Sequence, residues 1–423
     1  MKNILYIAYY YPPMKSGGTL RTEKFVKHLK QAGYRVCVLT AAYGQNRFDA
    51  DQDIIRVKDI SHNKNRRGMR KLQWFALRTW TEIQKKIGRY HSIYHWWREN
   101  AWRQRDQIMD LARPDLVIAT YPPVETLELA HRLSETFHLP LISDFRDGLL
   151  FEPIEQRLLR KSRTVRDHYA RLEKQAVAGS AWIATASEPI TGYFLRHYPG
   201  CRAETVYTGF DPESDSEATC ACIADHDDTF LVVYTGRFSL SDSSSSLEGF
   251  VFAMESLLRQ RPEAAVKIRF LIAGEMSAGE RKLLSRLERQ GVVSDCGLLE
   301  RKQAIALQKR ADLLLLVASA SRTSVVTTKV FEYLSAAKPI LALSRSDGAA
   351  ARIITRTRSG WVVPPGDSAR IRQTLASIIF DPGFRESLNR DEAAIASYAT
   401  GRQVAAIRRQ IEKLVPDSKI SRG

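Results

Sequence analysis

A lysine and a glutamate lie three positions apart in the segment Thr327-Thr328-Lys329-Val330-Phe331-Glu332. This spacing predicts a helix that begins near the threonines, whose hydroxyls can cap free N–H groups. A lysine in the first turn opposes the helix dipole, and that cost is explained if the lysine meets a phosphate at the same helix end. A carboxylate one turn later can accept both hydroxyls of a ribose. Thr328, Lys329 and Glu332 are therefore candidate nucleotide-binding residues, and the alternative is an ordinary amphipathic helix.

Two glycines end predicted strands earlier in the same half of the chain. Gly236 precedes Arg237, whose guanidinium could bind a diphosphate in bidentate fashion. Gly274 ends another strand, where the missing side chain lets a ligand approach the backbone. The alternatives are a solvated surface arginine for Arg237 and a simple turn for Gly274.

A third glycine-containing segment lies near the N-terminus. The loop from Tyr9 to Thr19 joins a predicted strand to a predicted helix and contains Gly17 and Gly18. Glycines there let backbone N–H groups approach an anion, to which the helix N-terminus adds its dipole. The loop is not G-x-G-x-x-G, so a dinucleotide fingerprint is not supported, and a tight turn without a ligand is the alternative.

These candidates must be positioned by an alternation of short β-rich runs and helical patterns, which indicates parallel sheets. We expect strands at 2–8, 35–40, 115–119, 141–144, 182–186, 230–234, 266–273, 313–318, 339–343 and 361–363, and helices at 20–32, 247–259, 280–290, 328–336 and 391–414. The fold class predicted is α/β, with two doubly wound Rossmann-like domains facing a cleft. Ligands in such sheets collect at the carboxyl ends of the strands.

The pattern restarts after an acidic stretch, which sets the expected domain boundaries. They are 1–210 for the first domain with an insertion at 61–105, 211–228 for an acidic linker, 229–385 for the second domain, and 386–423 for a C-terminal helix that returns towards the first domain. Three aspartates of the linker, Asp225, Asp227 and Asp228, are interpreted as solvated charge and not as a metal site.

Composition restricts the class of protein. The 423 residues are 44% hydrophobic and 26% charged, as in soluble globular chains. No apolar run approaches the roughly 20 residues that span a bilayer, and no signal-peptide cleavage site is seen. The five cysteines form neither a zinc spacing nor an even disulfide framework. We therefore expect a cytoplasmic protein.

The insertion at 61–105 is a basic aromatic block. It carries twelve Lys or Arg against two glutamates, and five of the seven tryptophans, within a chain of net charge +17. This pattern is typical of a helix in a membrane interface, where each nearby basic residue contributes about 1 kcal/mol. We expect contact with an anionic membrane surface through Arg66, Arg67, Arg70, Lys71, Trp74, Trp80, Trp96 and Trp97. The alternative is a helical pair buried against the first domain; nucleic-acid binding is not expected, since no recognised module accompanies the block.

Taken together, these segments resemble the nucleotide-sugar glycosyltransferases of the GT-B fold, specifically the family-four-like group. The motifs occur in the family's order over residues 1 to about 345. They are Tyr10 to Arg21, Ser143-Asp144-Phe145-Arg146-Asp147-Gly148, Tyr234 to Arg237, Ala273-Gly274, Lys329 to Leu334 and Lys338-Pro339-Ile340.

The resemblance implies roles for the second-domain residues. Glu332 would hold the donor ribose, while Arg237 and Lys329 would neutralise the leaving diphosphate without a metal or other cofactor. Two departures weaken this site: Ser324 stands where the family often has a first glutamate, and the usual lysine after Arg237 is missing.

In the first domain, the resemblance implies that Gly17 and Gly18 let a loop close over the donor or the acceptor. Asp144, Arg146 and Asp147 would lie at the cleft edge, where one carboxylate could bind an acceptor hydroxyl or act as a base. The family's histidine in this neighbourhood is absent. Alternatively, Asp144 and Arg146 form only an ion pair that shapes the loop.

The function expected is transfer of a sugar from a nucleotide-diphosphate donor to a lipid-linked glycan acceptor in cell-surface polysaccharide biosynthesis, at the inner face of the membrane. The resemblance implies retention of anomeric configuration. The alternatives are a nucleotide-sugar epimerase of the same fold and a non-catalytic, membrane-associated assembly partner.

Overall fold

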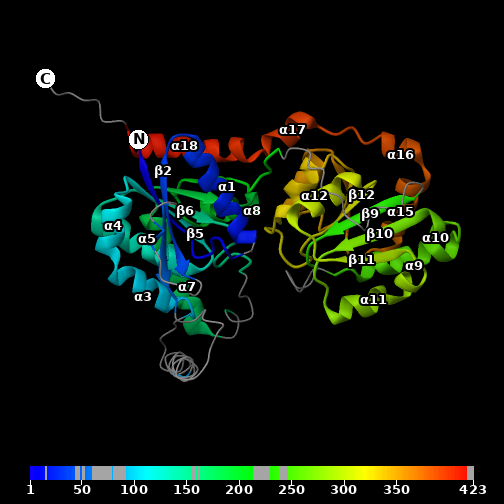
Figure 1. Ribbon diagram of the computed structural model, residues 1–423, viewed down its shortest axis with the longest axis horizontal. Helices are drawn as coiled ribbons and strands as arrows, with labels where there is room; N and C mark the ends of the chain where they lie inside the picture. Colours follow the sequence, from blue (N-terminus) through cyan, green and yellow to red (C-terminus); the bar gives the residue numbers. More distant parts are fainter. Residues whose placement is uncertain are drawn as a thin grey trace. The chain divides into compact units, whose positions relative to one another are not determined.

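The computed structural model describes residues 1–14, 17–42, 48–49, 53–59, 79, 92–153, 159, 162–212, 229–238 and 246–416. The chain forms two compact units, shown in Figure 1. Unit 1 consists of Met1–Thr208 together with the chain from Thr400, and unit 2 consists of Gly209–Ala399.

Unit 1 is built on an eight-stranded sheet in the order β3-β4-β2-β1-β5-β6-β7-β8. All neighbouring strands pair in parallel except β3 and β4. The elements are β1 (Asn3–Ile7), α1 (Gly17–Gln31), β2 (Arg35–Ala42), β3 (Phe48–Asp49), β4 (Ile54–Lys58), α3 (His95–Arg103), α4 (Arg105–Ala112), β5 (Leu116–Tyr121), α5 (Val124–Phe137), β6 (Leu141–Phe145), α7 (Arg163–Gly179), β7 (Trp182–Thr185), α8 (Glu188–His197), β8 (Ala203–Thr205) and α18 (Thr400–Leu414).

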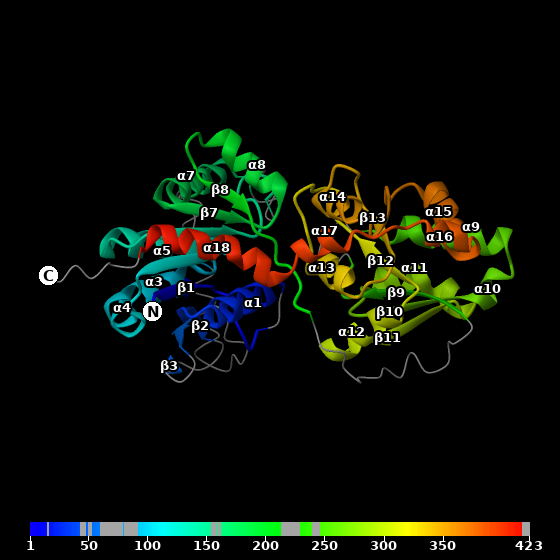
Figure 2. The same ribbon diagram turned by 90° about the horizontal axis from the view of Figure 1, so that it is seen from above.

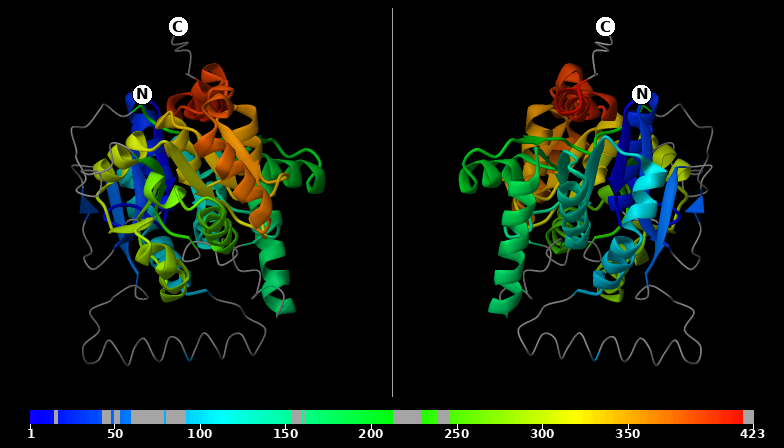
Figure 3. Two further views of the ribbon diagram at one scale, coloured as in Figure 1. Left: turned by 90° about the vertical axis from the view of Figure 1, so that its right-hand side faces the viewer. Right: turned by 90° about the vertical axis from the view of Figure 1, so that its left-hand side faces the viewer.

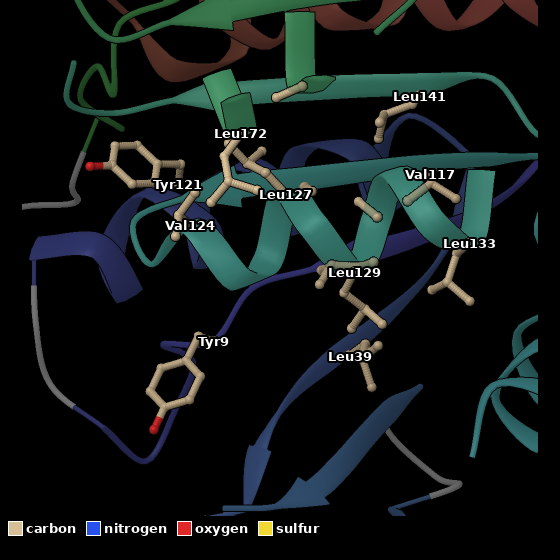
Figure 4. Close-up of a cluster of buried hydrophobic side chains, with 14 of the residues drawn as sticks. Tyr9, Leu39, Val117, Tyr121, Val124, Leu127, Leu129, Leu133, Leu141 and Leu172 are labelled. Atoms are coloured by element: carbon tan, nitrogen blue, oxygen red, sulfur yellow. The ribbon is translucent and has the colours of Figure 1, made fainter. Parts of the chain in front are cut away.

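Both faces of the unit 1 sheet are covered, which explains the nearly continuous apolar strands. Along β1, Leu5 and Ile7 join one hydrophobic cluster, while Ile4 and Tyr6 join the cluster on the other face. Figure 4 shows the first cluster, in which leucines of α5 pack over β5. Parallel pairing of β1 with β5 and of β5 with β6 places the carboxyl ends of these strands at one edge of the sheet.

The C-terminal helix α18 packs on α1 within unit 1 (Figure 2). Its Glu412 pairs with Lys2 and accepts a hydrogen bond from Tyr34, so the N-terminus lies beside α18 (Figure 3). The single helix predicted at 391–414 is wrong, because it is divided into α17 and α18. At the division the Tyr398 carbonyl accepts from the Phe210 N–H at 3.2 Å instead of continuing a helix.

Unit 2 has a six-stranded parallel sheet in the order β11-β10-β9-β12-β13-β14. Its elements are β9 (Phe230–Thr235), α9 (Glu248–Gln260), α10 (Ala264–Lys267), β10 (Ile268–Ala273), α11 (Ala278–Arg289), β11 (Val293–Gly297), α12 (Arg301–Arg310), β12 (Leu313–Val317), α13 (Thr328–Ser335), β13 (Ile340–Leu343), α14 (Ala349–Arg356), β14 (Gly360–Val363), α15 (Ser368–Phe380), α16 (Pro382–Glu386) and α17 (Glu392–Ser397).

Each sheet is doubly wound, so the fold class is confirmed. The strand order reverses between β1 and β5 in unit 1 and between β9 and β12 in unit 2. Crevices outside the carboxyl ends of strands at such points are where open α/β sheets bind ligands. Gly236 and Arg237 directly follow β9, while Gly17 and Gly18 begin α1, the helix after β1, and Thr328 and Lys329 begin α13, the helix after β12.

Candidate functional site

Two glycines bring the backbones of neighbouring loops together at the carboxyl edge of unit 2. Gly236, after β9, has φ 106°, and Gly274, after β10, has φ 153°. The Gly236 N–H donates to the Ala273 carbonyl at 2.6 Å. A β-carbon at Gly274 would collide with the Gly236 carbonyl oxygen. The close approach at these strand ends is between two segments of the chain itself, and the approach of a ligand to Gly274 stays a prediction.

Lys329 crosses from α13 to lie against Gly236. Its Nζ donates to the Tyr234 hydroxyl at 2.6 Å and to the Arg237 carbonyl at 2.9 Å. It also lies 4.5 Å from the centroid of the Tyr234 ring, a cation–π distance. A β-carbon at Gly236 would be 3.0 Å from Nζ and closer still to Cε. The glycine thus makes room for the lysine, which is held at the end of β9.

Burial is the main influence on the charge of this lysine. It lowers the Lys329 pKa to about 8, against a smaller opposing effect of the Glu332 carboxylate. The hydrogen-bond partners are a hydroxyl and a carbonyl, which satisfy the ammonium without neutralising it. An anion at this place would stabilise the charged form and raise the pKa again.

The first turn of α13 is not capped by a side chain, contrary to the expectation for the threonines. Thr327 is the N-cap residue, but its side chain makes no capping hydrogen bond. Its Oγ1 is buried and has no hydrogen-bond partner among the described residues. Thr328 and Lys329 follow as the first two helical residues. Free N–H groups, a positive helix end and an unpartnered hydroxyl together form an anion-binding arrangement.

Glu332 lies one turn along α13, as the spacing predicted. Its Oε1 accepts from Arg301 Nη1 at 3.2 Å, and its side chain is 20% exposed. Arg301 is the first residue of α12 and was not singled out from the sequence. The carboxylate has two oxygens with several acceptor positions, so a ribose can bind without displacing Arg301.

Arg237 forms an ion pair with Glu275, 2.7 Å between Nη2 and Oε2, and both side chains are about half exposed. The pair joins the residues that follow Gly236 and Gly274. An exposed pair of this kind is weak, so a diphosphate can compete for the guanidinium.

A buried polar network that sequence reasoning missed supports the end of β9. The Thr235 N–H donates to the Tyr333 hydroxyl at 3.0 Å, and Gln308 Nε2 donates to Thr235 Oγ1 at 2.8 Å. All three residues are buried. The network fixes Tyr333 on α13 against β9, and therefore fixes the position of Lys329 and Glu332 on the same helix. The network joins residues that are far apart in the sequence, so only the three-dimensional structure reveals it.

In unit 1 the two N-terminal glycines belong to a helix, not to the predicted loop, because α1 begins at Gly17. A β-carbon at Gly18 would collide with the guanidinium of Arg146, which follows β6. Arg146 donates from Nε to the Tyr121 carbonyl at 3.1 Å and from Nη2 to the Pro122 carbonyl at 2.6 Å. Burial lowers its pKa, but arginine remains charged in proteins. The structure thus brings together Gly18 and Arg146 at the carboxyl edge.

Asp144 does not lie in an open site, which corrects both interpretations of this residue. It is 1% exposed and forms a bidentate ion pair with Arg21, at 2.6 and 3.1 Å. Thr120 donates a third hydrogen bond at 2.9 Å. Its partner is therefore Arg21 and not Arg146, and the Asp144 carboxylate is enclosed by these contacts and not exposed to a substrate. Asp147, three residues later, is only half buried.

A buried glutamate at the same edge was not predicted. Glu125, in the first turn of α5, is 4% exposed and accepts a hydrogen bond from Ser92 through Oε1. Its Oε2 has no hydrogen-bond partner in the described structure. Burial, with a contribution from Glu128, raises the pKa of Glu125 to about 7. Nothing in the spacing around Glu125 distinguishes it from a solvated helix residue.

The basic aromatic block lies largely outside the described residues. Among the residues proposed to contact a membrane, Arg66, Arg67, Arg70, Lys71, Trp74 and Trp80 fall in the undescribed part. Trp97 is fully buried, and its ring lies 5.2 Å from that of Tyr9. The prediction of membrane contact is therefore wrong for Trp97, whereas Trp96 is partly exposed.

Metal-binding clusters and membrane-spanning helices are both absent from the described residues. No group of three or more His, Cys, Asp or Glu there is placed to hold a metal ion. No helix there is long and apolar enough to cross a membrane. The aspartates Asp225, Asp227 and Asp228 lie outside the described residues.

Comparisons with known proteins agree with this geometry. Residues 229–381 match the family model described as Glycosyl transferases group 1. A sucrose-phosphate synthase from Thermosynechococcus elongatus has a similar structure, with TM-score 0.66 and 15% identity, over 98% of this chain and 99% of that one. Anabaena Alr3699/HepE in complex with UDP-glucose gives TM-score 0.61 and 16% identity, over 97% and 99%. A glycosyltransferase from Rickettsia africae gives 0.62 and 13%, over 99% of both chains.

None of the curated proteins compared with the chain matches it. The structural likeness covers almost the whole chain, and at these identities it defines the fold, which is that of the GT-B proteins. The family match covers most of unit 2, including the lysine, the uncapped helix and the glutamate. Residues 229–381 therefore match a group 1 glycosyltransferase domain, within a chain that has the GT-B fold.

Proposed function

We propose that unit 2 binds the diphosphate of a nucleotide-sugar donor at the N-terminus of α13. The observation that carries this proposal is the partly buried ammonium of Lys329, held at Gly236 beside an uncapped helix end. Lys329 and the free N–H groups would bind the phosphates, Arg237 would leave Glu275 to join them, and Glu332 would accept the ribose hydroxyls.

The positive groups at this helix end also account for departure of the diphosphate. As the bond to the sugar breaks, negative charge develops on the leaving phosphate, and Lys329 and the N–H groups at the helix end, which are already in place, stabilise it. We therefore propose that transfer needs neither a metal nor another cofactor. Retention of anomeric configuration is proposed on the family resemblance.

For the acceptor, we propose a lipid-linked glycan of cell-surface polysaccharide biosynthesis, bound by a protein that is peripheral on the inner membrane face. The support is the charge of the block at 61–105, twelve basic residues against two acidic ones. Arg146, whose guanidinium is held by two carbonyls at the carboxyl edge of unit 1, is the proposed contact for the acceptor. Asp147 remains the candidate acceptor-binding carboxylate.

The donor proposal is tested by thermal unfolding of the full chain with nucleoside diphosphates and their sugars, in EDTA without added metal. A ligand that binds the folded state at 100 times its Kd stabilises it by about 2.7 kcal/mol. Selective stabilisation by one base, lost in Lys329→Gln, would support the site. The absence of stabilisation across a saturating panel would refute donor binding and favour a non-catalytic role.

The membrane proposal needs a separate experiment. Sedimentation with phosphatidylglycerol vesicles should pull down the wild type, and Ser substitutions at Arg66, Arg67, Arg70 and Lys71 should release it. A matched control removes four basic residues from α11, namely Arg281, Lys282, Arg286 and Arg289. Undiminished sedimentation of the first variant, or equal loss in the control, would contradict a specific role for the block.

A further inference from the structure

A surface cavity of about 610 Å³ lies beside β14, the edge strand of the unit 2 sheet. Its walls come from β14, the end of α14, one side of α15 and the segment around α16. Its lining residues include Thr355, Arg358, Trp361, Arg370, Thr374 and Phe384, followed by Ser387 and Asn389. Small-molecule sites usually have volumes of about 300–1,000 Å³. The cavity shares no residue with the proposed nucleotide site, since β12 and β13 separate β14 from β9.

The charge of the cavity favours an anion. Its lining contains two arginines, Arg358 and Arg370, and no carboxylate. Arg358 Nη2 lies 3.4 Å from Asp391 Oδ2, and its side chain remains 54% exposed. Arg370 forms no ion pair in the described part of unit 2, although its backbone N–H is capped by Asp367. The surrounding residues 352–392 include seven arginines against five carboxylates.

The backbone of Arg358 gives a second observation. It has φ 47°, a left-handed conformation in which glycine or asparagine costs less than other residues. The position follows α14, where a glycine would be the ordinary choice for ending the helix. An arginine there accepts backbone strain and directs a guanidinium to the cavity wall. A guanidinium that stays 54% exposed beside its Asp391 partner, together with backbone strain at the same position, indicates a ligand contact.

The remaining lining is that of a site for a hydroxyl-rich ring. The rings of Trp361 and Phe384 stack with centroids 5.2 Å apart and planes 14° apart, and both are only half buried. Around them are the hydroxyls of two threonines and a serine and the amide of Asn389. Hydroxyls and amides both donate and accept, which matches the hydroxyl groups of a sugar.

We propose that this cavity binds a small sugar that carries a phosphate or a carboxylate group. Arg358 and Arg370 bind the anionic group, which guanidinium groups recognise in bidentate geometry. The hydroxyl and amide side chains bind the sugar hydroxyls, and the partly exposed face of Trp361 covers the ring. The proposal is independent of the nucleotide site.

The experiment follows the indole N–H signal of Trp361 in the full-length protein labelled with ¹⁵N, assigned by its loss in Trp361→Phe. Glucose 6-phosphate, glucuronate, inorganic phosphate and glucose are titrated separately. We expect saturable shifts with one or both of the anionic sugars and at least about tenfold weaker binding of glucose. The double variant R358Q/R370Q should bind the anionic sugar about tenfold or more weakly, as expected for loss of charged hydrogen bonds.

Two controls separate the outcomes. R259Q/R289Q removes the same charge from exposed arginines outside the cavity and should change affinity less than about twofold. T374Y fills the cavity without changing charge and should also abolish the shift. The proposal is overturned if neither anionic sugar gives a saturable shift at about 20 mM, if R358Q/R370Q binds like the wild type, or if inorganic phosphate binds as tightly as the tighter-binding anionic sugar.

Discussion

The side chain of Lys329 occupies the space that a β-carbon at Gly236 would need. The two residues lie 93 positions apart, on opposite sides of the point where the strand order of unit 2 reverses. Glycine is required at position 236 for two reasons, because φ is 106° and because the lysine must pass. The position of the Lys329 ammonium, on α13, therefore depends on the backbone at Gly236, which follows β9.

Gly236→Ala should therefore weaken binding of nucleoside diphosphates by about tenfold or more, because Lys329 must move away from the helix end. The backbone strain should also cost about 1–3 kcal/mol of stability. Gly291→Ala is the matched control, since Gly291 has φ 70° but no atom lies within 4 Å of the position that its β-carbon would take. The Gly291→Ala protein should be less stable than the wild type and should bind nucleoside diphosphates with unchanged affinity. Equal losses of affinity in the two variants would contradict the packing argument.

The lowered pKa of Lys329 predicts the pH dependence of nucleotide binding. In the free protein the ammonium loses its proton above about pH 8, so binding of a diphosphate must then include uptake of a proton. Affinity measured by calorimetry should be constant between about pH 6.5 and 7.5 and fall by up to about tenfold per unit above about pH 8. Lys329→Gln should bind weakly with little pH dependence. A wild-type affinity unchanged at about pH 9.5, with the fold intact by circular dichroism, would exclude this role.

Glu332→Ala should weaken nucleoside-diphosphate binding by about 10-fold to 150-fold, the loss expected for hydrogen bonds to a charged acceptor. Glu332 could bind the ribose or only hold Arg301 in place. Comparing the affinities for the ordinary nucleotide and its 2′,3′-dideoxy analogue separates these two roles. Wild type should prefer the nucleotide with both hydroxyls, and Glu332→Ala should show almost no preference. If the variant still discriminates the two nucleotides, the carboxylate serves only its ion pair with Arg301.

Asp144→Asn should destabilise the fold by about 3–5 kcal/mol, because it leaves the buried Arg21 without its counter-charge. The measurement is chemical unfolding at neutral pH. Asp147→Asn, at the half-buried residue three positions later and past the end of β6, should cost less than about 1 kcal/mol. If the Asp144→Asn protein is as stable as the wild type but has lost transfer activity, Asp144 takes part in the reaction. That result would contradict the structural role inferred from its ion pair with Arg21.

The sequence predicted the architecture well because its evidence is local and periodic. Apolar strands buried on both faces and amphipathic helices are recognisable one segment at a time, so most strands that position the sites were located. Short edge strands such as β8 and β11 were missed, because β8 has three partly buried residues and β11 places only its first residue in the core. The segment 391–414 has a continuous helical pattern, which predicted one helix. The chain passes from unit 2 to unit 1 between Ala399 and Thr400, and the helix is divided there into α17 and α18.

The candidate sites were predictable only in part, since partner choice depends on distant segments. Lys329 and Glu332 could be found from spacing on one helix. The pairing of Asp144 with Arg21 could not, because 123 positions separate them and Arg146 is the nearer cation in sequence. Glu125 was missed for a related reason: its burial comes from its place in the fold and not from its neighbours in sequence.

Glu125 leads to a test of stability against pH. Its pKa is raised from 4.5 to about 7 by burial, so the folded state holds a proton that the unfolded state has released between these pH values. The folded state therefore loses stability as pH rises from about 4.5 to 7, by up to about 3 kcal/mol. Glu125→Gln resembles the protonated form and avoids this loss. Relative to wild type, it should gain up to about 3 kcal/mol between about pH 4.5 and pH 8.

Chemical unfolding at about pH 4.5, 6 and 8 measures this gain. Glu135→Gln is the control, because Glu135 lies on the same helix with its side chain 68% exposed, and its difference from wild type should change little with pH. If the difference in free energy of unfolding between Glu125→Gln and wild type is the same at all three pH values, the Glu125 carboxyl has an ordinary pKa in the folded state. Oε2 of Glu125 would then be hydrated in solution, and the Glu125 carboxyl would be ionised at neutral pH.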